Sequence, residues 1–185
     1  DAFDDPRWTR YICFGCVQSG KTLLSVIIPA AKTLFDNNEN FGAGVPTMDV
    51  AADKWRDEYH PTFKRSFSQY LPQKSGAGSR GGKKFEAITF TNGRTLKFLS
   101  GSGGSEKRSG ITLRHIGITE ADKVDVPPVK STDPNPIGEI EGRLASHGDD
   151  SKLWAECTVT TKQGFVYREW MAGSQGEIVK PCPHC

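Results

Sequence analysis

The sequence lacks any long apolar run. Its longest, TLLSVIIPAA at residues 22–31, is interrupted by Pro29 and is far shorter than the roughly 20 apolar residues that a membrane-spanning helix needs. The chain begins at Asp1 and shows no signal-peptide pattern. We therefore expect a protein that neither enters a membrane nor is secreted, and we interpret the chain as a fragment of a longer protein.

A large excess of charge of one sign is missing too. The chain has 24 Lys and Arg against 22 Asp and Glu, and this net charge of +2 neither requires nor excludes a nucleic-acid partner. Basic residues do gather in two Gly- and Ser-rich segments, at 78–84 and 106–110. These segments are either solvated surface loops or flexible loops that contact phosphates.

Cysteine is scarce, and the count of 5 is odd, which argues against a disulfide-stabilised secreted scaffold and favours a reducing cytosol. Cys13-x-x-Cys16 and Cys182-x-x-Cys185 resemble two halves of a zinc site. The gap between them, however, is far longer than the usual spacing of about 15–20 residues. We expect no zinc in this chain, whereas a longer protein could bind Zn²⁺ through Cys182, Cys185 and ligands that follow them.

The 185 residues suffice for one α/β domain, which we assign to residues 1–180, with 181–185 as the start of a truncated CxxC segment. Segments typical of strands alternate with segments of helical spacing. This alternation predicts a mostly parallel sheet with helices on both faces. The expected strands are residues 9–15, 41–47, 112–119 and 152–160, and the expected helices are residues 20–35, 48–67, 137–147 and 164–174.

Prolines and a turn signal modify this pattern. We expect Pro29 to kink its helix or reset the first turns, and Pro61 to bend or break the helix that contains it. Residues 85–99 alternate apolar and polar side chains on both sides of Asn92-Gly93. That dipeptide supplies the positive φ angles of a tight turn, so these residues predict a β-hairpin.

The segment GCVQSGKT matches the pattern G-x-x-x-x-G-K-[ST] between an expected strand and an expected helix, which is the context of a phosphate-binding P-loop. Glycines permit a close approach of the backbone N–H groups to phosphate, and the helix N-terminus favours the anion. Lys21 would neutralise the β- and γ-phosphates, and Thr22 would ligate Mg²⁺. The expected nucleotide-binding residues are Gly15, Cys16, Val17, Gln18, Ser19, Gly20, Lys21 and Thr22.

An acidic turn follows the expected strand at 112–119. Glu120 lies at the carboxyl end of that strand, where ligands bind in open α/β sheets. We interpret it as the carboxylate that orients or deprotonates water, although a solvated acidic turn would have the same sequence. A third segment, ECTVTTKQG at 156–164, places Thr158, Thr160 and Thr161 after another strand. These hydroxyls either contact the γ-phosphate or the acidic turn, or are only a threonine-rich strand end.

Taken in order, these segments resemble the ATPase domain of the large terminase subunit of tailed bacteriophages, in the lambda-like packaging group. The resemblance implies a P-loop NTPase fold of the RecA-like, additional-strand, catalytic-glutamate type. It further implies ATP and Mg²⁺ as cofactors, double-stranded DNA as substrate, and a nuclease domain that this chain lacks. The implied partners are the small terminase subunit, the portal and prohead, and further copies in a ring, all in the host cell cytoplasm. The segments that carry it are DPRWTRYICFGCVQSGKT, GVPTMDVAADKWRDEYHPTFK, ITFTNGRTLKFLSGSGGSEKRSG, IGITEADKVD, EIEGRLASHG, LWAECTVTTKQGFVYREW and PCPHC.

The resemblance also implies individual roles. Glu120 would be the catalytic glutamate, with Lys21 as the P-loop lysine, and Thr158 and Thr160 would belong to a motif that couples hydrolysis to movement. Arg143 is a candidate for sensing phosphate or contacting a neighbouring subunit, and Arg108 is a weaker one. Either arginine would also fit an ordinary surface role.

The sequence departs from the family at Thr119, where an aspartate usually holds Mg²⁺ through water. Thr119 could bind that water beside Thr22, Asp122 could supply the missing charge, or turnover could be slow; we favour the first. Two alternatives to the packaging function also remain. A helicase-like ATPase has a similar arrangement of motifs, and a nucleotide-binding switch would need no hydrolysis.

Overall fold

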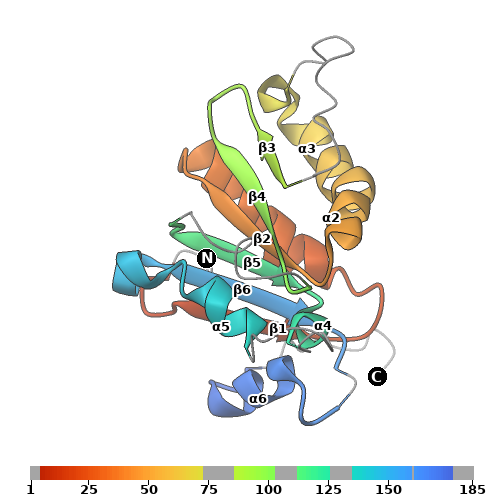
Figure 1. Ribbon diagram of the computed structural model, residues 1–185, viewed down its shortest axis with the longest axis vertical. Coiled ribbons are helices and arrows are strands. Elements are labelled where there is room, and N and C mark those ends of the chain that lie inside the picture. The colour runs from red at the N-terminus through yellow and green to blue at the C-terminus, as the bar shows by residue number, and fades with distance from the viewer. Residues whose placement is uncertain (1–4, 73–85, 103–111, 126–134, 160, 177–185) are drawn as a thin grey trace, which may run out of the picture.

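The computed structural model describes residues 5–72, 86–102, 112–125, 135–159 and 161–176 (Figure 1). Within these residues, six strands form one sheet in the order β1-β6-β5-β2-β4-β3. Every neighbouring pair is parallel except β3 with β4, which confirms the mostly parallel sheet. The strands are β1 (Arg10–Phe14), β2 (Phe41–Val45), β3 (Ala87–Thr89), β4 (Thr95–Ser100), β5 (His115–Thr119) and β6 (Lys152–Cys157).

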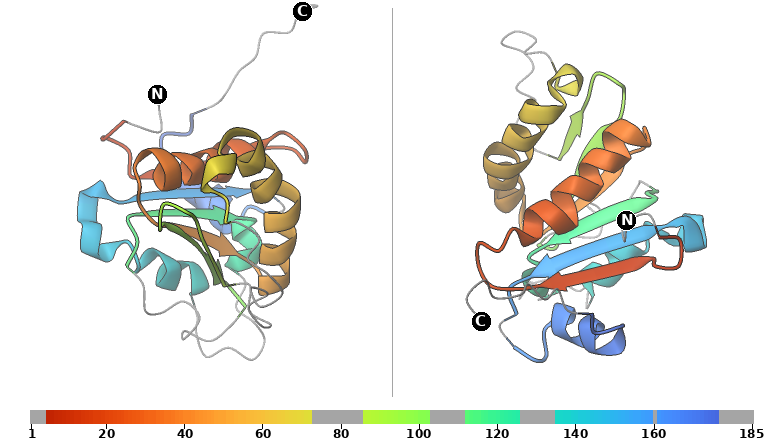
Figure 2. Two further views of the ribbon diagram at one scale, coloured as in Figure 1. Left: turned by 90° about the horizontal axis from the view of Figure 1, so that it is seen from above. Right: turned by 180° about the vertical axis from the view of Figure 1, so that it is seen from behind.

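Helices cover both faces of this sheet (Figure 2). One face carries the helical run that follows β1, composed of η2 (Leu23–Ile27), α1 (Ile28–Ala31) and η3 (Lys32–Asp36). It also carries the run α2 (Met48–Lys54), η4 (Trp55–Tyr59) and α3 (His60–Ser66), which leads to η5 (Ser68–Tyr70). The remaining helices are α4 (Ala121–Val124), α5 (Pro136–Glu141), η7 (Ala145–Asp150) and α6 (Phe165–Ala172).

The hydrophobic core is divided by the sheet into two clusters. In one cluster, Val26, Leu34 and Phe63 of the helices pack against residues of β2 on one face of the sheet. The other joins Ile116 and Ile118 to apolar side chains of α4, α5 and α6. Gly117 lets the first helical run lie close to the sheet, because a Cβ at this position would come within 2.9 Å of Val26. In the described part of the chain, no helix is long and apolar enough to cross a membrane.

Neither proline ends its helix. Pro29 lies in the first turn of α1, directly after the π-helical segment η2, and Pro61 lies in the first turn of α3, directly after the π-helical segment η4. The hydroxyl of Thr62 donates a 2.7 Å hydrogen bond to the backbone oxygen of Glu58, so a carbonyl in the wide turn keeps a partner. The prediction that Pro61 could break the helix is therefore wrong, because helical bonding resumes at once after each π-helical segment.

The predicted hairpin is formed by β3 and β4, but its turn differs from the expected one. Only Gly93 of the central pair has a positive φ, of 79°, and the turn is closed by the 2.8 Å bond from Phe90 N–H to the Arg94 oxygen. The side-chain amide of Asn92 instead donates to the backbone oxygen of Leu34 at 2.9 Å. Asn92 thus attaches the hairpin to η3 and does not supply a second positive angle.

Candidate active site

The carboxyl ends of β1, β5 and β6 meet at one edge of the sheet, because the three strands are parallel. Strand β6 lies between β1, which leads into the P-loop, and β5, which leads into the acidic turn. This confirms the additional-strand arrangement expected from the resemblance. The sheet edge therefore combines three chain segments that are far apart in sequence.

The P-loop follows β1 and turns sharply before its helix. Gln18 and Gly20 have φ angles of 61° and 80°, and the helix begins with the 3.0 Å bond from Leu24 N–H to the Gly20 oxygen. The ammonium group of Lys21 donates a 2.7 Å hydrogen bond to the backbone oxygen of Cys16. Lys21 is thus folded over the loop, where its positive charge adds to that of the helix N-terminus.

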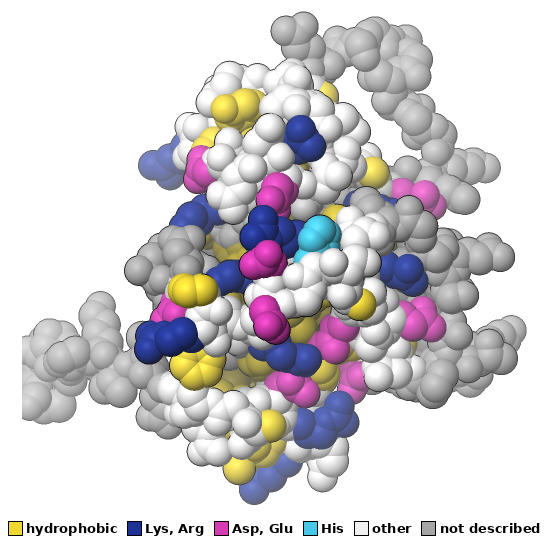
Figure 3. Space-filling view, turned by 90° about the vertical axis from the view of Figure 1, so that its left-hand side faces the viewer, with side chains coloured by type: hydrophobic (Ala, Val, Ile, Leu, Met, Phe, Trp, Pro, Cys, Tyr) yellow, Lys and Arg dark blue, Asp and Glu magenta, His cyan; other side chains and the backbone are white. Residues whose placement is uncertain are grey.

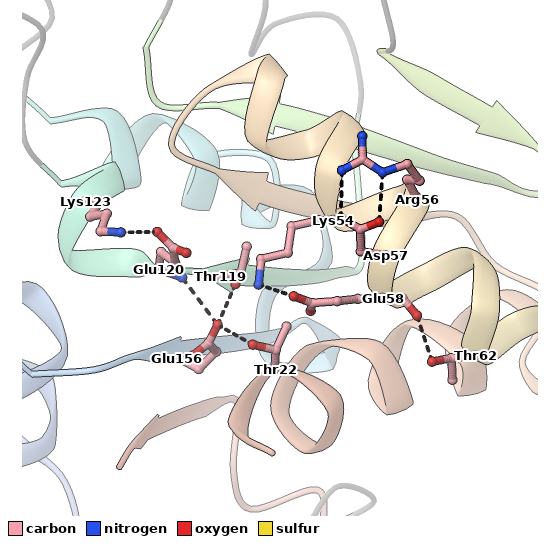
Figure 4. A network of polar contacts seen from close by, with 10 residues as sticks. All are labelled: Thr22, Lys54, Arg56, Asp57, Glu58, Thr62, Thr119, Glu120, Lys123 and Glu156. Carbon is pink, nitrogen blue, oxygen red and sulfur yellow. Dashed lines mark hydrogen bonds and ion pairs between the residues drawn. The ribbon is translucent and has the colours of Figure 1, made fainter. Parts of the chain in front are cut away.

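Three segments converge on the carboxylate of Glu156 (Figure 4). Its Oε1 accepts hydrogen bonds from the hydroxyl of Thr22 at 3.0 Å, from the hydroxyl of Thr119 at 2.5 Å, and from the backbone N–H of Glu120 at 3.4 Å. The structure therefore brings together both of the threonines predicted to act on Mg²⁺. It adds an acid that the sequence interpretation had not assigned to the site.

Glu156 occupies this place because of the register of β6. It is paired with Thr119 on one side and with Cys13 on the other, and it is only 3% exposed. Burying a carboxylate costs several kcal/mol unless donors or cations compensate. The ion pairs found among the described residues include none with Glu156. A lone acid in the apolar strand KLWAEC was the sequence signal that could have revealed it.

Glu120 directly follows β5 and has a left-handed backbone conformation, with φ 52° and ψ 47°. A non-glycine residue in this region carries a cost of about 1–3 kcal/mol, and such residues cluster at active sites. Its carboxylate is held 2.6 Å from the ammonium group of Lys123, one turn later on α4. This bond raises the pKa of Lys123 above its usual value.

The carboxylate of Asp122 is bonded to a different element, α6. Its Oδ1 accepts a 2.8 Å hydrogen bond from the backbone N–H of Val166, in the first turn of α6. Gly164, the residue before α6, is so close to this carboxylate that a Cβ there would collide with it. Asp122 is therefore committed to the start of α6, and its position disagrees with the option that it replaces the missing aspartate.

The structure does not bring Arg143 to the site of its own chain. The Arg143 backbone oxygen accepts a 3.0 Å bond from Leu113 N–H, just before β5. The six residues from there to Thr119 span about 20 Å of extended chain, beyond the reach of an arginine side chain. Thr158 follows β6 at the correct edge and is half-buried. Thr160 and Arg108 lie outside the described residues.

A basic side chain from another element flanks the cluster. Lys54, at the end of α2, is 14% exposed and lies 2.6 Å from Glu58. Figure 4 shows its ammonium group on the side of α2 that faces Thr119 and Glu156. Tyr59 is fully buried, and both burial and the charges of Glu58 and Glu156 raise its pKa. The sequence interpretation missed Lys54 because nothing in its spacing distinguishes it from a surface helix residue.

The cysteines do not form a metal centre in the described residues. Cys16 is exposed, Cys13 is half-buried, and Cys157 is buried, which raises the pKa of its thiol. No group of three or more His, Cys, Asp or Glu side chains that could hold a metal ion occurs in the ranges the structure describes. The segment 181–185, with its CxxC pattern, is outside those ranges.

The cavity at the other edge of the sheet is separate from this site. It has a volume of about 520 Å³, lies at the amino-terminal ends of β5 and β6, and is lined by Glu39, Arg114, His115 and Lys152 among others. Figure 3 shows acidic and basic side chains mixed on this face. Because the P-loop lies at the carboxyl ends of the same strands, this cavity is not the nucleotide site.

Solved structures of phage large terminases have a similar fold. One from a thermophilic bacteriophage superposes with a TM-score of 0.62 at 17% identity, over 92% of this chain and 38% of that one. The ATPase domain of the Thermus phage P74-26 large terminase gives a TM-score of 0.58 at 19% identity, over 95% of this chain and 68% of that one. A large terminase from the thermophilic phage in complex with ADP gives 0.55 at 18% identity, over 90% of this chain and 38% of that one.

The chain thus spans less than two fifths of the length of the large terminases that it superposes on. No match to an individual curated protein was found. The whole chain, residues 1–185, matches the family described as "Phage terminase large subunit gpA, ATPase domain". The family match therefore confirms the resemblance seen in the motifs: this chain belongs to the ATPase domains of phage terminase large subunits.

Proposed function

We propose that this domain binds ATP with Mg²⁺ and hydrolyses it to drive double-stranded DNA into a prohead. The observation that carries the proposal is the convergence of Thr22, Thr119 and Glu156 beside Glu120, at the edge of the sheet where the P-loop lies. Family membership supplies the packaging context. A P-loop alone would serve binding, whereas an adjacent carboxylate at the end of β5 serves hydrolysis.

The phosphates would be bound by the backbone N–H groups of residues 15–22 and by Lys21. The ammonium group of Lys21 now contacts only an uncharged carbonyl, that of Cys16, among its described hydrogen bonds. A charge-assisted bond to phosphate is stronger than a bond to a neutral carbonyl. We therefore expect Lys21 to exchange its partner when nucleotide binds.

The oxygen-rich cluster fits Mg²⁺, which prefers oxygen ligands in an octahedral arrangement and retains several waters. Thr22 would be the direct protein ligand, and Thr119 would hold a metal-bound water. A metal ion held by these residues would supply positive charge that neutralises the phosphates of the nucleotide. This fit rests on the buried Glu156 carboxylate and Thr119 hydroxyl, which neighbouring strands place together, and on the half-buried hydroxyl of Thr22 at the helix start.

Glu120 would orient the attacking water. The left-handed backbone conformation of Glu120 turns the chain away from the direction of β5. The Glu120 side chain is one third exposed, so water can reach the carboxylate. Lys123 donates a 2.6 Å hydrogen bond to this carboxylate, and a carboxylate can accept a proton or a hydrogen bond from water. The short contact with Lys123 also implies that Glu120 has to separate from Lys123 or share its carboxylate before it contacts water.

The remaining roles involve other subunits and partners. Arg143 would act on the γ-phosphate of a neighbouring copy in a ring, since it lies too far from the site of its own chain. Thr158 and Thr160 would couple hydrolysis to movement of the DNA. The small terminase subunit and the portal of the prohead would be the partners, in the cytoplasm of the host cell. The catalytic domain would be followed by a nuclease in the longer protein.

An ATPase assay on the longer protein tests this proposal, with and without duplex DNA and proheads. We expect DNA-stimulated hydrolysis and uptake of DNA into nuclease-resistant form. Lys21→Ala should weaken ATP binding by about 10- to 100-fold, since a charge-assisted hydrogen bond contributes about 1.5–3 kcal/mol. Lys64→Ala, an exposed lysine on α3, is the matched control. Strand separation without uptake would instead indicate a helicase, and ATP binding without hydrolysis a switch.

A further inference from the structure

We propose that Glu156 supplies the metal-holding carboxylate that the chain lacks at position 119. This inference rests on the proposed function, because it assigns a residue to the Mg²⁺ of that same site. The negative charge would thus come from β6, the strand between β1 and β5. In the usual family pattern it comes from the end of the strand that corresponds to β5. Thr119 then orients Glu156 and accepts from a metal-bound water, and it does not take the place of an acid.

The strand register puts the two positions side by side. Thr119 and Glu156 are Cα partners in the parallel pair β5–β6, and their side chains lie on the same face. A carboxylate at 156 therefore reaches the space beside the P-loop that a carboxylate at 119 would occupy. The 3.0 Å bond to Thr22 shows that it also reaches the threonine predicted to ligate the metal.

The direction of the hydrogen bonds leaves the correct atoms available for a cation. A hydroxyl has one donor hydrogen and two acceptor lone pairs. A carboxylate only accepts, so Thr22 and Thr119 each donate their hydrogen to Glu156. Both hydroxyl oxygens then keep their lone pairs, so Thr22 can ligate Mg²⁺ and Thr119 can accept from a metal-bound water.

The carboxylate of Glu156 has no ion pair among the described residues, and the nearby ammonium group of Lys54 is paired with Glu58. All of the described hydrogen bonds of Glu156 go to Oε1, and none comes from Lys or Arg. The neighbouring acids are otherwise engaged, Glu120 with Lys123 and Asp122 with the first turn of α6. A buried carboxylate without a counter-ion is stabilised by a bound cation. Among these three acids, Glu156 is the one that contacts Thr22 at the P-loop.

Titration of Mg²⁺ against binding of the fluorescent nucleotide mant-ADP tests the inference. Glu156→Gln keeps the size of the side chain and removes its charge. We expect it to raise the Mg²⁺ concentration at half-effect by about 10- to 100-fold. Affinity for mant-ADP in EDTA should stay within about twofold. The double variant Thr119→Asp/Glu156→Gln moves the charge back to β5 and should restore the original Mg²⁺ dependence.

Glu39→Gln is the control, because Glu39 is a half-buried carboxylate at the opposite edge of the sheet. It should leave the Mg²⁺ titration unchanged. An unchanged titration in Glu156→Gln, or no recovery in the double variant, would overturn the inference while the nucleotide site stands. Failure of the unchanged chain to bind mant-ADP at any Mg²⁺ concentration would overturn the nucleotide site and the inference together. Circular dichroism confirms that each variant is folded.

Discussion

Thr119 on β5 and Glu156 on β6 are partners across parallel strands, and the hydroxyl of the first donates a 2.5 Å hydrogen bond to the carboxylate of the second. An acid and a hydroxyl therefore share the place next to the P-loop. Their separation of 37 positions in the sequence hides this relationship from any motif that is read along a single strand.

Replacing Thr119 by Asp alone should destabilise the fold without Mg²⁺. Two carboxylates would then lie opposite each other in a buried strand pair, and like charges in this arrangement lower the free energy of unfolding by about 1 kcal/mol or more. Mg²⁺ with ADP should recover that loss, because the cation separates the two charges. Thermal unfolding with and without Mg²⁺ measures both effects, and Thr119→Asn, which adds no charge, should show no such recovery.

Glu120→Gln should separate nucleotide binding from hydrolysis. The amide cannot accept a proton from water, so turnover should fall by about 10²- to 10⁴-fold. Binding of mant-ADP should stay within about twofold, because Glu120 contacts Lys123 and not the P-loop in the structure. Single-turnover hydrolysis on the longer protein measures the first quantity. Normal turnover in this variant would contradict the assignment of Glu120.

Nucleotide should protect Cys16 from alkylation. Cys16 is exposed in the P-loop, whereas Cys157 is buried and its thiol has a raised pKa, so it reacts slowly. A phosphate bound across the loop would cover Cys16 and slow its reaction with a maleimide by about tenfold or more. A tenfold effect corresponds to about 1.4 kcal/mol of free energy needed to expose the thiol again. Peptide mass mapping distinguishes the two sites, and equal labelling with and without ADP would contradict nucleotide binding at this loop.

Much of the architecture follows from local patterns. Alternating segments predict the parallel sheet, and the pattern around Gly15, Gly20 and Lys21 predicts the P-loop because its chemistry is local to eight residues. The place of Glu156 depends instead on the pairing of strands that are distant in sequence, which no local pattern reports. The same holds for Asp122, whose partner Val166 is 44 residues away.

The prolines in the helical runs show a second limit of prediction from the sequence. A break at Pro61 was one of the alternatives that the sequence predicts, but Pro61, like Pro29, follows a π-helical segment and the helical run continues. The π-helical turn before each proline accommodates a residue that has no N–H to donate. Packing of the helices on the sheet compensates the free-energy cost of the lost hydrogen bond. Propensity alone does not include this tertiary contribution.

Stability should fall below neutral pH because of His115. Burial lowers its pKa from 6.5 to about 4, against the smaller opposing effect of Glu39. The unfolded chain therefore takes up a proton near pH 6.5, while the folded chain does so only near pH 4. The contribution of His115 to the free energy of unfolding is fully present above pH 6.5 and is lost as the pH falls towards 4. The whole loss is about 3 kcal/mol.

Urea unfolding between pH 4 and 7.5 measures this slope. Glu39, Arg114, Lys152 and His147 are the charged or titratable groups that act on His115, and Thr33 contacts its Nδ1 at 3.2 Å. His115→Gln should flatten the dependence in this window, because it removes the group that protonates on unfolding. His60→Gln, on α3, should retain it. An equal slope in both variants would assign the pH dependence to other groups.

Asp122 should stabilise α6 through its bond to Val166. Asp122→Ala removes an acceptor from the first turn of the helix, and losses of this kind cost about 0.5–2 kcal/mol. Gly164→Ala should have a similar effect by another route, because its Cβ would push the Asp122 carboxylate away. Hydrogen exchange at α6 should rise in both variants. Gly173→Ala, at the other end of α6, leaves the Asp122 contact intact and serves as the control.

The turn after β5 is fastened twice to the same stretch of chain. Thr119 and the backbone of Glu120 bind Glu156 at its beginning, and Asp122 binds Val166 at its end. The segment between those two attachment points therefore begins and ends in contact with the turn that carries the expected catalytic residue. We expect a displacement of that turn to be transmitted both to the end of β6 and to the start of α6.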